Sequence, residues 1–256
     1  MEFSSDIGRL QRRAASSMAG MSRRQAILEA LPVSKGDHVL DIGCGGGHLL
    51  DHLAKDVGDD GHVFGLDPSA DQLAEAKTRC AEHDNVTLLH SFADAIDLPD
   101  ASCHAITSTQ TLEYIEDVDA SLSEATRVLM PGGWLVNVSI LWDHFCFYGA
   151  DADLNARIHD AFRAHCHHQM LPMELPGKLT ALGYRHIRDT SLAFVNTRRN
   201  ANTPAFYLEQ LMAGFALGQG VAEADVTTWR EQLAAAEAEG RFGFTSFPVL
   251  TAACRG

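Results

Sequence analysis

Two aspartates and the glycine-rich segment between them are the residues of this sequence best suited to bind a ligand. Asp41 stands two residues before the segment 43–47, which reads G-x-G-x-G, and Asp67 lies twenty residues after Gly47. Glycines permit a turn whose backbone approaches a ligand without a Cβ in the way. A carboxylate at the spacing of Asp67 accepts hydrogen bonds from ribose hydroxyls. The pattern predicts a ligand that contains a ribose, and it disfavours the alternative of a purely structural turn.

The residue after the glycines argues against a redox dinucleotide. A dinucleotide fingerprint has glycine or alanine at its last position, where helix and strand pack closely, and His48 occupies that position here. Asp41 is a second departure from that fingerprint. A nicotinamide-dependent oxidoreductase is therefore a disfavoured alternative.

Strands and helices alternate on either side of this turn. Short apolar runs predict strands, and apolar residues at helical spacing predict the helices between them. The predicted strands are 38–42, 63–67, 86–89, 103–108 and 134–140, and the predicted helices are 48–56, 69–81 and 117–129, with a helix stop and turn at 131–133. This alternation is typical of an α/β, Rossmann-like, doubly wound and mainly parallel sheet with helices on both faces.

After residue 141 the alternation is interrupted. We expect one helix within 142–170, another before Gly183, a strand at 186–194, helices at 204–217 and 222–239, and a last strand at 244–253, which makes seven strands in all. We take residues 1–256 as one domain. Its core is 34–141, its helical cap comprises the N-terminal helices of 1–33 and the insertions 142–170 and 197–240, and 243–256 form its last strand.

Composition limits the setting and the partners. The net charge of −14, from 20 basic and 34 acidic residues, disfavours nucleic acid and anionic membrane surfaces as partners. The sequence has no stretch of 18 consecutive apolar residues and no signal-peptide core, so we expect no membrane span. The cysteines are scattered without a C-x-x-C pair, as expected of reduced thiols in a cytoplasmic protein: Cys44, Cys80, Cys103, Cys146, Cys166 and Cys254.

Four motifs resemble a known family when they are taken together. They are VLDIGCGGG at 39–47, GLD at 65–67, DA with LP at 94–95 and 98–99, and RVLMPGG at 127–133. The set is similar to the successive motifs of class I S-adenosylmethionine-dependent methyltransferases. The most similar subgroup includes ubiquinone and menaquinone biosynthesis enzymes and many natural-product methyltransferases. The likeness covers about residues 36–140.

The resemblance implies S-adenosylmethionine as cofactor and S-adenosylhomocysteine as product. Asp41 and the backbone at Gly43 and Gly45 would hold the methionine end, and Asp67 would accept the ribose hydroxyls. The other implied cofactor contacts are Pro68 beside that acid, Asp94 and the backbone of Ala95 at the adenine, and Thr109 or Gln110 next to the methionine carboxylate and sulfonium. Met130 stands where the family usually has lysine, a change that leaves the proline and glycines of that motif intact.

Histidines outside the motifs are candidates for further chemistry. His144 follows the fifth predicted strand, where ligands of open parallel sheets bind, and it is our candidate general base, with a purely structural loop histidine as the alternative. The run His165-Cys166-His167-His168 contains good zinc ligands, and on a helix His165 and His168 would share a face. No spacing supplies a further ligand, so we predict no metal site.

The functional expectation is methyl transfer to an oxygen, nitrogen or carbon atom of a small organic acceptor. Aromatic residues in the late insertion, Phe206, Tyr207 and Phe215, favour an acceptor with hydrophobic bulk. The alternative is a catalytically silent protein that binds S-adenosylmethionine as a scaffold or sensor. We expect a monomer or a homodimer.

Overall fold

The computed structural model describes residues 17–200 and 203–256. The chain divides into two compact units. The sheet unit comprises Arg23–Ile140, Met170–Ser191 and Val249–Gly256, and the small unit comprises Leu141–Gln169, the described part of Leu192–Pro248, and residues 17–22. The expected insertion 142–170 and almost all of the insertion 197–240 belong to the small unit.

The sheet unit is built on seven strands in the order β3-β2-β1-β4-β5-β10-β7. Their bounds are His38–Ile42 (β1), His62–Leu66 (β2), Val86–Leu89 (β3), Cys103–Thr109 (β4), Leu129–Ile140 (β5), Tyr184–Ser191 (β7) and Pro248–Arg255 (β10). Strands β1 to β5 pair in parallel, and β7 pairs antiparallel with β10. The strand order reverses between β1 and β4, and the carboxyl ends at such a switch point are where ligands of open α/β sheets bind. The predicted Rossmann-like, mainly parallel seven-stranded sheet is confirmed.

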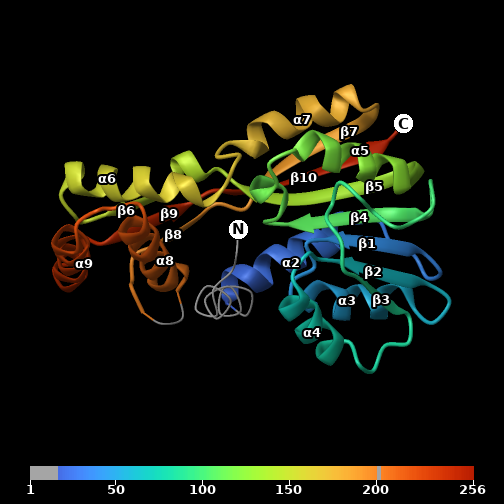
Figure 1. The fold of residues 1–256 in the computed structure, drawn as a ribbon, viewed down its shortest axis with the longest axis horizontal. Helices are drawn as coiled ribbons and strands as arrows, with labels where there is room; N and C mark the ends of the chain where they lie inside the picture. The colour runs from blue at the N-terminus through green and yellow to red at the C-terminus, as the bar shows by residue number, and fades with distance from the viewer. Residues whose placement is uncertain (1–16, 201–202) are drawn as a thin grey trace. The chain divides into compact units, whose positions relative to one another are not determined.

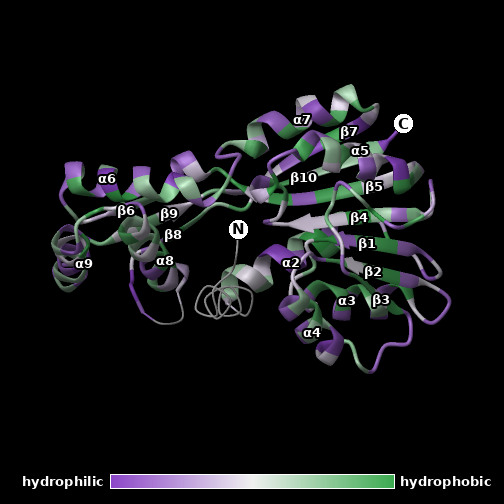
Figure 2. Cartoon of the chain, viewed as in Figure 1, coloured by the Kyte–Doolittle hydropathy of each residue, from purple (hydrophilic) through white to green (hydrophobic). Residues whose placement is uncertain are grey.

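Helices cover both faces of this sheet. Helices α3 (His48–Val57) and α4 (Ala70–Arg79) lie on one side, and α5 (Val118–Val128) and α7 (Leu171–Ala181) lie on the other (Figure 1). Apolar residues of β1, β2, β4 and β5 pack against α5 and α7 in one core cluster, which includes Leu40, Ile106, Leu122 and Leu175. Figure 2 shows β1 and β2 largely in the colour of hydrophobic residues, as expected of strands buried on both faces.

Capping residues explain where these helices begin. The N-cap of α3 is Gly47, whose left-handed φ of 76° turns the chain directly from the glycine segment into the helix. The Ser69 hydroxyl caps α4 by accepting the N–H of Gln72. The Asp117 carboxylate caps α5 by accepting the N–H of Ala120 at 2.9 Å. Side chains that accept the free N–H groups of a first turn fix the start of a helix.

The small unit has an antiparallel sheet of its own, in the order β6-β9-β8. Its elements are α2 (Met18–Ala30), which continues into the sheet unit, β6 (Cys146–Tyr148), α6 (Ala152–Phe162), β8 (Phe194–Asn196), α8 (Pro204–Gly218), α9 (Glu223–Ala238) and β9 (Gly243–Ser246). Its core is aromatic: the ring of Phe244 lies 4.8 Å from Phe145 and 4.6 Å from Phe147, centroid to centroid. Glu209, buried on α8, forms ion pairs with Arg199 and Arg230. Aromatic packing and a paired buried charge therefore hold this unit together.

Three predicted segments differ from the structure. The single strands expected at 186–194 and 244–253 are wrong, because each divides into one strand of the sheet unit and one of the small unit. Pro248, which has no N–H to donate, begins β10 at one of these divisions. The turn expected at 131–133 lies within the bounds of β5, where Gly132 has φ 81° and the register with β4 shifts between Leu129 and Trp134, so the proline and glycines interrupt the regular pairing of the strand.

Other expectations concern the N-terminus and membranes. Helix α2 confirms the second part of the helical region expected within residues 1–33, and residues 1–16 lie outside the described residues. Within 17–200 and 203–256, no helix has both the length and the hydropathy needed to cross a bilayer.

Candidate functional site

Asp41 occupies the centre of the sheet near the carboxyl end of β1. In register, Gly65 of β2 lies on one side of it and Thr107 of β4 on the other. The Asp41 side chain is buried, and the Thr107 hydroxyl donates a hydrogen bond of 2.8 Å to its Oδ1 atom. Burial raises the pKa of Asp41 to about 7, opposed by the Thr107 hydrogen bond and reinforced by the charge of Asp67. A carboxylate held in this way is suited to a ligand that carries a positive charge or hydrogen-bond donors.

The glycine segment follows Asp41 as a tight turn. The N–H groups of Gly43 and Cys44 both donate to the carbonyl of Leu66, at 2.8 and 3.0 Å, which fixes the turn against the end of β2. Gly43 has φ 73°, and a Cβ atom on it would lie 2.0 Å from Oγ1 of Thr111. Gly45 has φ 51°. Gly43 thus requires glycine both for its backbone conformation and for its close approach to Thr111, whereas the expected approach of the turn to a ligand stays a prediction.

Asp67 extends from the end of β2 and holds the turn from the other side. Its Oδ2 atom accepts the N–H of Gly45 at 2.9 Å, and its Oδ1 atom accepts the N–H of Ser69 at 2.9 Å. Burial raises the pKa of this carboxyl, and the two backbone hydrogen bonds partly oppose that shift. Each carboxylate oxygen keeps a lone pair, so Asp67 can accept two further hydrogen bonds from vicinal hydroxyls.

Thr109 and Gln110 mark the carboxyl end of β4. Gln110 adopts the left-handed region at φ 51°, which is uncommon for a residue with a side chain, and its N–H donates to the carbonyl of Val138 at 2.7 Å. The Oγ1 atom of Thr109 is buried and has no hydrogen-bond partner in the described part of the chain. A strained backbone beside an unsatisfied hydroxyl at this edge is consistent with a ligand-binding role.

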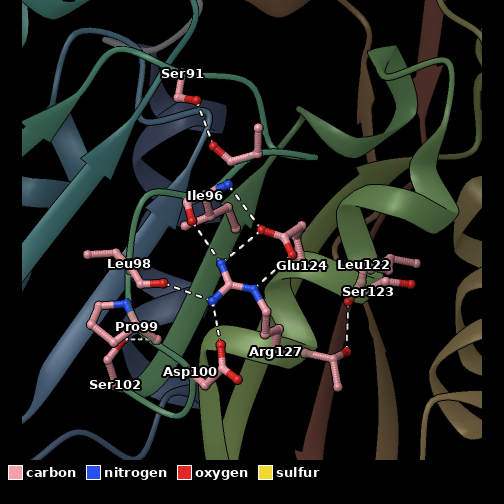
Figure 3. Close-up of polar contacts among 12 residues, drawn as sticks. Ser91, Ile96, Leu98, Pro99, Asp100, Ser102, Leu122, Ser123, Glu124 and Arg127 are labelled. Carbon is pink, nitrogen blue, oxygen red and sulfur yellow. Dashed lines mark hydrogen bonds and ion pairs between the residues drawn. The ribbon is translucent and has the colours of Figure 1, made fainter.

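Asp94 and Ala95 lie on the loop after β3, and both are exposed, as is Pro68 after β2. The Ala95 carbonyl accepts the Ser91 hydroxyl at 2.7 Å. Arg127 of α5 fixes the next part of this loop, as Figure 3 shows. Its guanidinium donates five hydrogen bonds of 2.7 to 2.9 Å, to the carbonyls of Ile96 and Leu98, to the Asp100 carboxylate, and to both carboxylate oxygens of Glu124. Sequence reasoning missed this clamp, because its backbone acceptors carry no side-chain signal.

His144 belongs to the small unit, whereas all the other expected site residues belong to the sheet unit. It ends the 3₁₀ helix Trp142–His144, and its side chain is exposed. Its ring centroid lies 6.4 Å from that of Phe247. Its role as a base stays a prediction.

The other histidine run is not arranged as the helical pattern suggested. A 3₁₀ helix ends at His165, and Cys166 is extended, so His165 and His168 do not share a helix face. The buried His165 ring stacks on Phe162 with centroids 3.9 Å apart, and burial lowers its pKa to about 4. Among the described residues, no group of three His, Cys, Asp or Glu side chains is placed to hold a metal ion. None of the six cysteines, all within the described part, is in a disulfide.

Glu113 is a further buried acid at this edge that the sequence analysis did not single out. It lies on the 3₁₀ helix Leu112–Tyr114, three residues beyond Gln110, and is fully buried. A carboxylate inside the apolar run T-L-E-Y-I, directly after a predicted strand, was the signal that could have identified it.

Comparison with known proteins agrees with this geometry. A family described as "methyltransferase domain" matches residues 39–133. A demethylmenaquinone methyltransferase from Staphylococcus aureus is 37% identical over 115 residues, which cover 44% of this chain and 47% of that protein. An uncharacterised 37.1 kDa protein from a transposon of Streptomyces fradiae is 34% identical over 129 residues, 50% of this chain and 37% of that protein. The chain thus matches less than half the length of these relatives.

Solved structures share the fold over nearly the whole chain. A putative methyltransferase from Bacillus halodurans has a TM-score of 0.63 at 17% identity and covers 91% of this chain and 99% of its own. Geranyl diphosphate C-methyltransferase from Streptomyces coelicolor, solved with S-adenosyl-L-homocysteine, has a TM-score of 0.55 at 18% identity, covering 92% of this chain and 76% of its own. At such identities the likeness establishes the fold alone. The family match over residues 39–133 bears out the resemblance drawn from the motifs: this part of the chain is similar to the class I S-adenosylmethionine-dependent methyltransferases.

Proposed function

We propose that this protein binds S-adenosylmethionine and transfers its methyl group to an oxygen, nitrogen or carbon atom of a small organic acceptor. The observation that carries the proposal is the pair of buried carboxylates, Asp41 and Asp67, on either side of a turn that admits no Cβ at Gly43. The names of similar proteins, which include a demethylmenaquinone and a geranyl diphosphate methyltransferase, support an acceptor with hydrophobic bulk.

The residues present fit an adenosyl amino acid. Asp41 and the backbone of Gly43 and Gly45 would hold the amino-acid end, since a buried carboxylate attracts an ammonium group and a glycine turn admits close contact. The buried and unpaired Thr109 hydroxyl offers a partner to a ligand carboxylate, and Gln110 lies beside it.

The other end of the ligand would lie along the loops after β2 and β3. Asp67 would accept the ribose hydroxyls, with Pro68 next to it. Asp94 and the backbone of Ala95 would contact the adenine. When bound, S-adenosylmethionine supplies a methyl group on a positively charged sulfur, and its transfer to a nucleophile leaves the neutral S-adenosylhomocysteine. The chain's own contribution is to orient the two reactants and to exclude water.

The acceptor side of the reaction rests on the small unit. We propose His144 as the base for acceptors that must lose a proton, and residues 142–170 and 197–240 as the segments that contact the acceptor. The net charge of −14 supports a small molecule rather than nucleic acid as substrate. We further propose one domain over 1–256, a cytoplasmic location, and a monomer or homodimer.

Calorimetry with S-adenosylmethionine tests the binding, and a labelled-methyl assay with a panel of quinols, isoprenoid phosphates and phenols tests the transfer. We expect binding in the micromolar range, typical of enzyme ligands, and its loss when Asp41 and Asp67 are both replaced by alanine. Unchanged affinity in that variant would contradict the proposed site. Cofactor binding without transfer to any acceptor in the panel or in cell extract would favour a silent scaffold.

A further inference from the structure

Glu113 links the ends of two neighbouring strands at the edge of the sheet that we assign to the cofactor. Its Oε2 atom accepts the Ser139 hydroxyl at 2.9 Å, and its Oε1 atom accepts the N–H of Ile140 at 3.4 Å. Both partners belong to the end of β5, whereas Glu113 follows β4. The acid therefore fixes the segment after Gln110 to the adjacent strand.

The donors around Glu113 form a chain with a direction. The Asn137 amide donates to Oγ of Ser139 at 2.9 Å, so the Ser139 proton is free to point at Glu113. All three side chains are fully or almost fully buried. A chain in which each member donates toward the carboxyl group stabilises its ionised form.

This polar network is costly for a fold core. Oδ1 of Asn137 and Oγ of Ser108, which is in register with it on β4, are both buried and lack a hydrogen-bond partner within the described residues. Each buried polar group that lacks a hydrogen-bond partner destabilises the folded state. Apolar side chains at these strand positions would avoid that cost, so the network points to a role beyond folding.

The Glu113 carboxyl group changes its protonation state near neutral pH. Burial raises its pKa to about 7, although hydrogen bonds from the Ser139 hydroxyl and the Ile140 N–H act in the opposite direction. Arg23 of α2 is the charged side chain whose field lowers that pKa. Above neutral pH the site edge therefore gains a negative charge that it lacks below.

We propose that the buried carboxylate of Glu113 is a positioning residue of the cofactor site that makes the protein bind the positively charged sulfonium cofactor in preference to its neutral thioether product. The inference rests on the proposed function. Glu113 lies three positions after Gln110, so their Cα atoms are at most about 10 Å apart, and Gln110 is the residue that we assign to the sulfonium end of the cofactor. For two opposite unit charges about 10 Å apart, at an effective dielectric constant of about 20, the attraction corresponds to roughly a factor of ten in affinity. Such a preference would favour exchange of spent product for fresh cofactor.

The test compares two ligands that differ in charge, S-adenosylmethionine and S-adenosylhomocysteine, by calorimetry on the full chain. In Glu113→Gln, we expect the affinity ratio of the two ligands to fall roughly tenfold at about pH 8.5. At about pH 5.5, where Glu113 is protonated, wild type and variant should agree. Asp41 is unchanged in both proteins, so its own titration cancels. Glu116→Gln, the same change at an exposed site three residues on, should behave as wild type.

A second variant keeps the inference testable if Glu113→Gln fails to fold. Ser139→Ala removes the donor to the ionised form, so the pH at which the ligand preference appears should move upward. If Glu113→Gln loses affinity equally for both ligands, or keeps the wild-type affinity ratio at both pH values, the proposed role of Glu113 is wrong, whereas the proposed function still stands. A wild-type protein that binds neither ligand would overturn the proposed function and this inference with it.

Discussion

The Thr107 hydroxyl donates to Oδ1 of Asp41 across two neighbouring strands, at 2.8 Å. Thr107 is therefore the direct hydrogen-bond partner of the Asp41 carboxylate. That carboxylate is buried in the interior of the sheet, and burial raises the pKa of Asp41 to about 7. The surroundings of Asp41 therefore disfavour its ionised form in the ligand-free protein. A bound ligand with a positive charge would stabilise that form.

The first prediction concerns the stability of the ligand-free protein. Because the folded-state pKa of Asp41 lies above the value of 3.8 for an unperturbed aspartate, the folded state binds the proton more tightly, and stability falls as pH rises from about 4 to 7. Asp41→Asn removes this contribution. We expect the variant to equal wild type in free energy of unfolding at about pH 3, below the unperturbed pKa, and to exceed it by up to about 4 kcal/mol at pH 8.

Urea unfolding followed by circular dichroism at the two pH values measures this difference. Asp59→Asn, on the exposed turn after α3, serves as the matched control and should change stability little at either pH. The same Asp41→Asn variant should lose affinity for S-adenosylmethionine. A variant that is destabilised at pH 8 would show that Asp41 carries a structural charge instead.

Asp67→Asn gives the second prediction. The carboxylate accepts hydrogen bonds from Gly45 and Ser69, and we propose that it also accepts the ribose hydroxyls. Losing hydrogen bonds to a charged group should weaken binding of S-adenosylmethionine roughly 100-fold. Calorimetry measures the loss, with Asp84→Asn in the exposed turn before β3 as control. If adenosine binding survives unchanged, the ribose is held elsewhere.

The third prediction separates backbone conformation from close approach in the glycine turn. Gly43 and Gly132 both have positive φ values, 73° and 81°, but a Cβ atom would collide with Thr111 only at Gly43. Gly132→Ala should therefore cost about 1–2 kcal/mol, the conformational term alone. Gly43→Ala should cost several kcal/mol and abolish cofactor binding. Thermal unfolding of both variants tests this, and equal losses would contradict the crowding at Thr111.

The sequence predicted the parallel core well because its signals are local. The positive φ values at Gly43, Gly45 and Gly47 are a local property of the turn, and the spacing of Asp41 and Asp67 around it depends on one strand–helix–strand unit. Strand bounds in β1 and β3 agree with the prediction, since each is a short segment rich in apolar and β-branched residues.

The features that sequence reasoning missed depend on contacts distant along the chain. Glu113 becomes a fully buried acid only because the end of β5 supplies Ser139, 26 residues away. The last predicted strand divides at Phe247 because the residues before it pair in the three-stranded sheet, as β9, and the residues after it pair in the seven-stranded sheet, as β10. Pro248 is a local signal for the break, but which sheet each part joins depends on strands that are distant along the chain.

Arg127 gives the last prediction, and it concerns the loop that we assign to the adenine. Its five hydrogen bonds join α5 to the segment 96–100 (Figure 3). The hydrogen bonds with Glu124 and Asp100 raise the pKa of the guanidinium, so it stays charged at every accessible pH. Lysine keeps the charge but cannot supply five donors in a fixed plane. Arg127→Lys should therefore destabilise the protein by about 2 kcal/mol and weaken binding of S-adenosylmethionine.

The matched control for this variant is Arg157→Lys, at an ion pair with Asp225 whose two side chains are 57% and 37% exposed. Exposed pairs contribute less than about 1 kcal/mol, so that variant should resemble wild type. Hydrogen exchange adds a local readout, because loss of the clamp should raise exchange at Ile96, whose N–H donates to Glu124. Equal stability of the two variants, with unchanged exchange at Ile96, would show that the loop is held without Arg127.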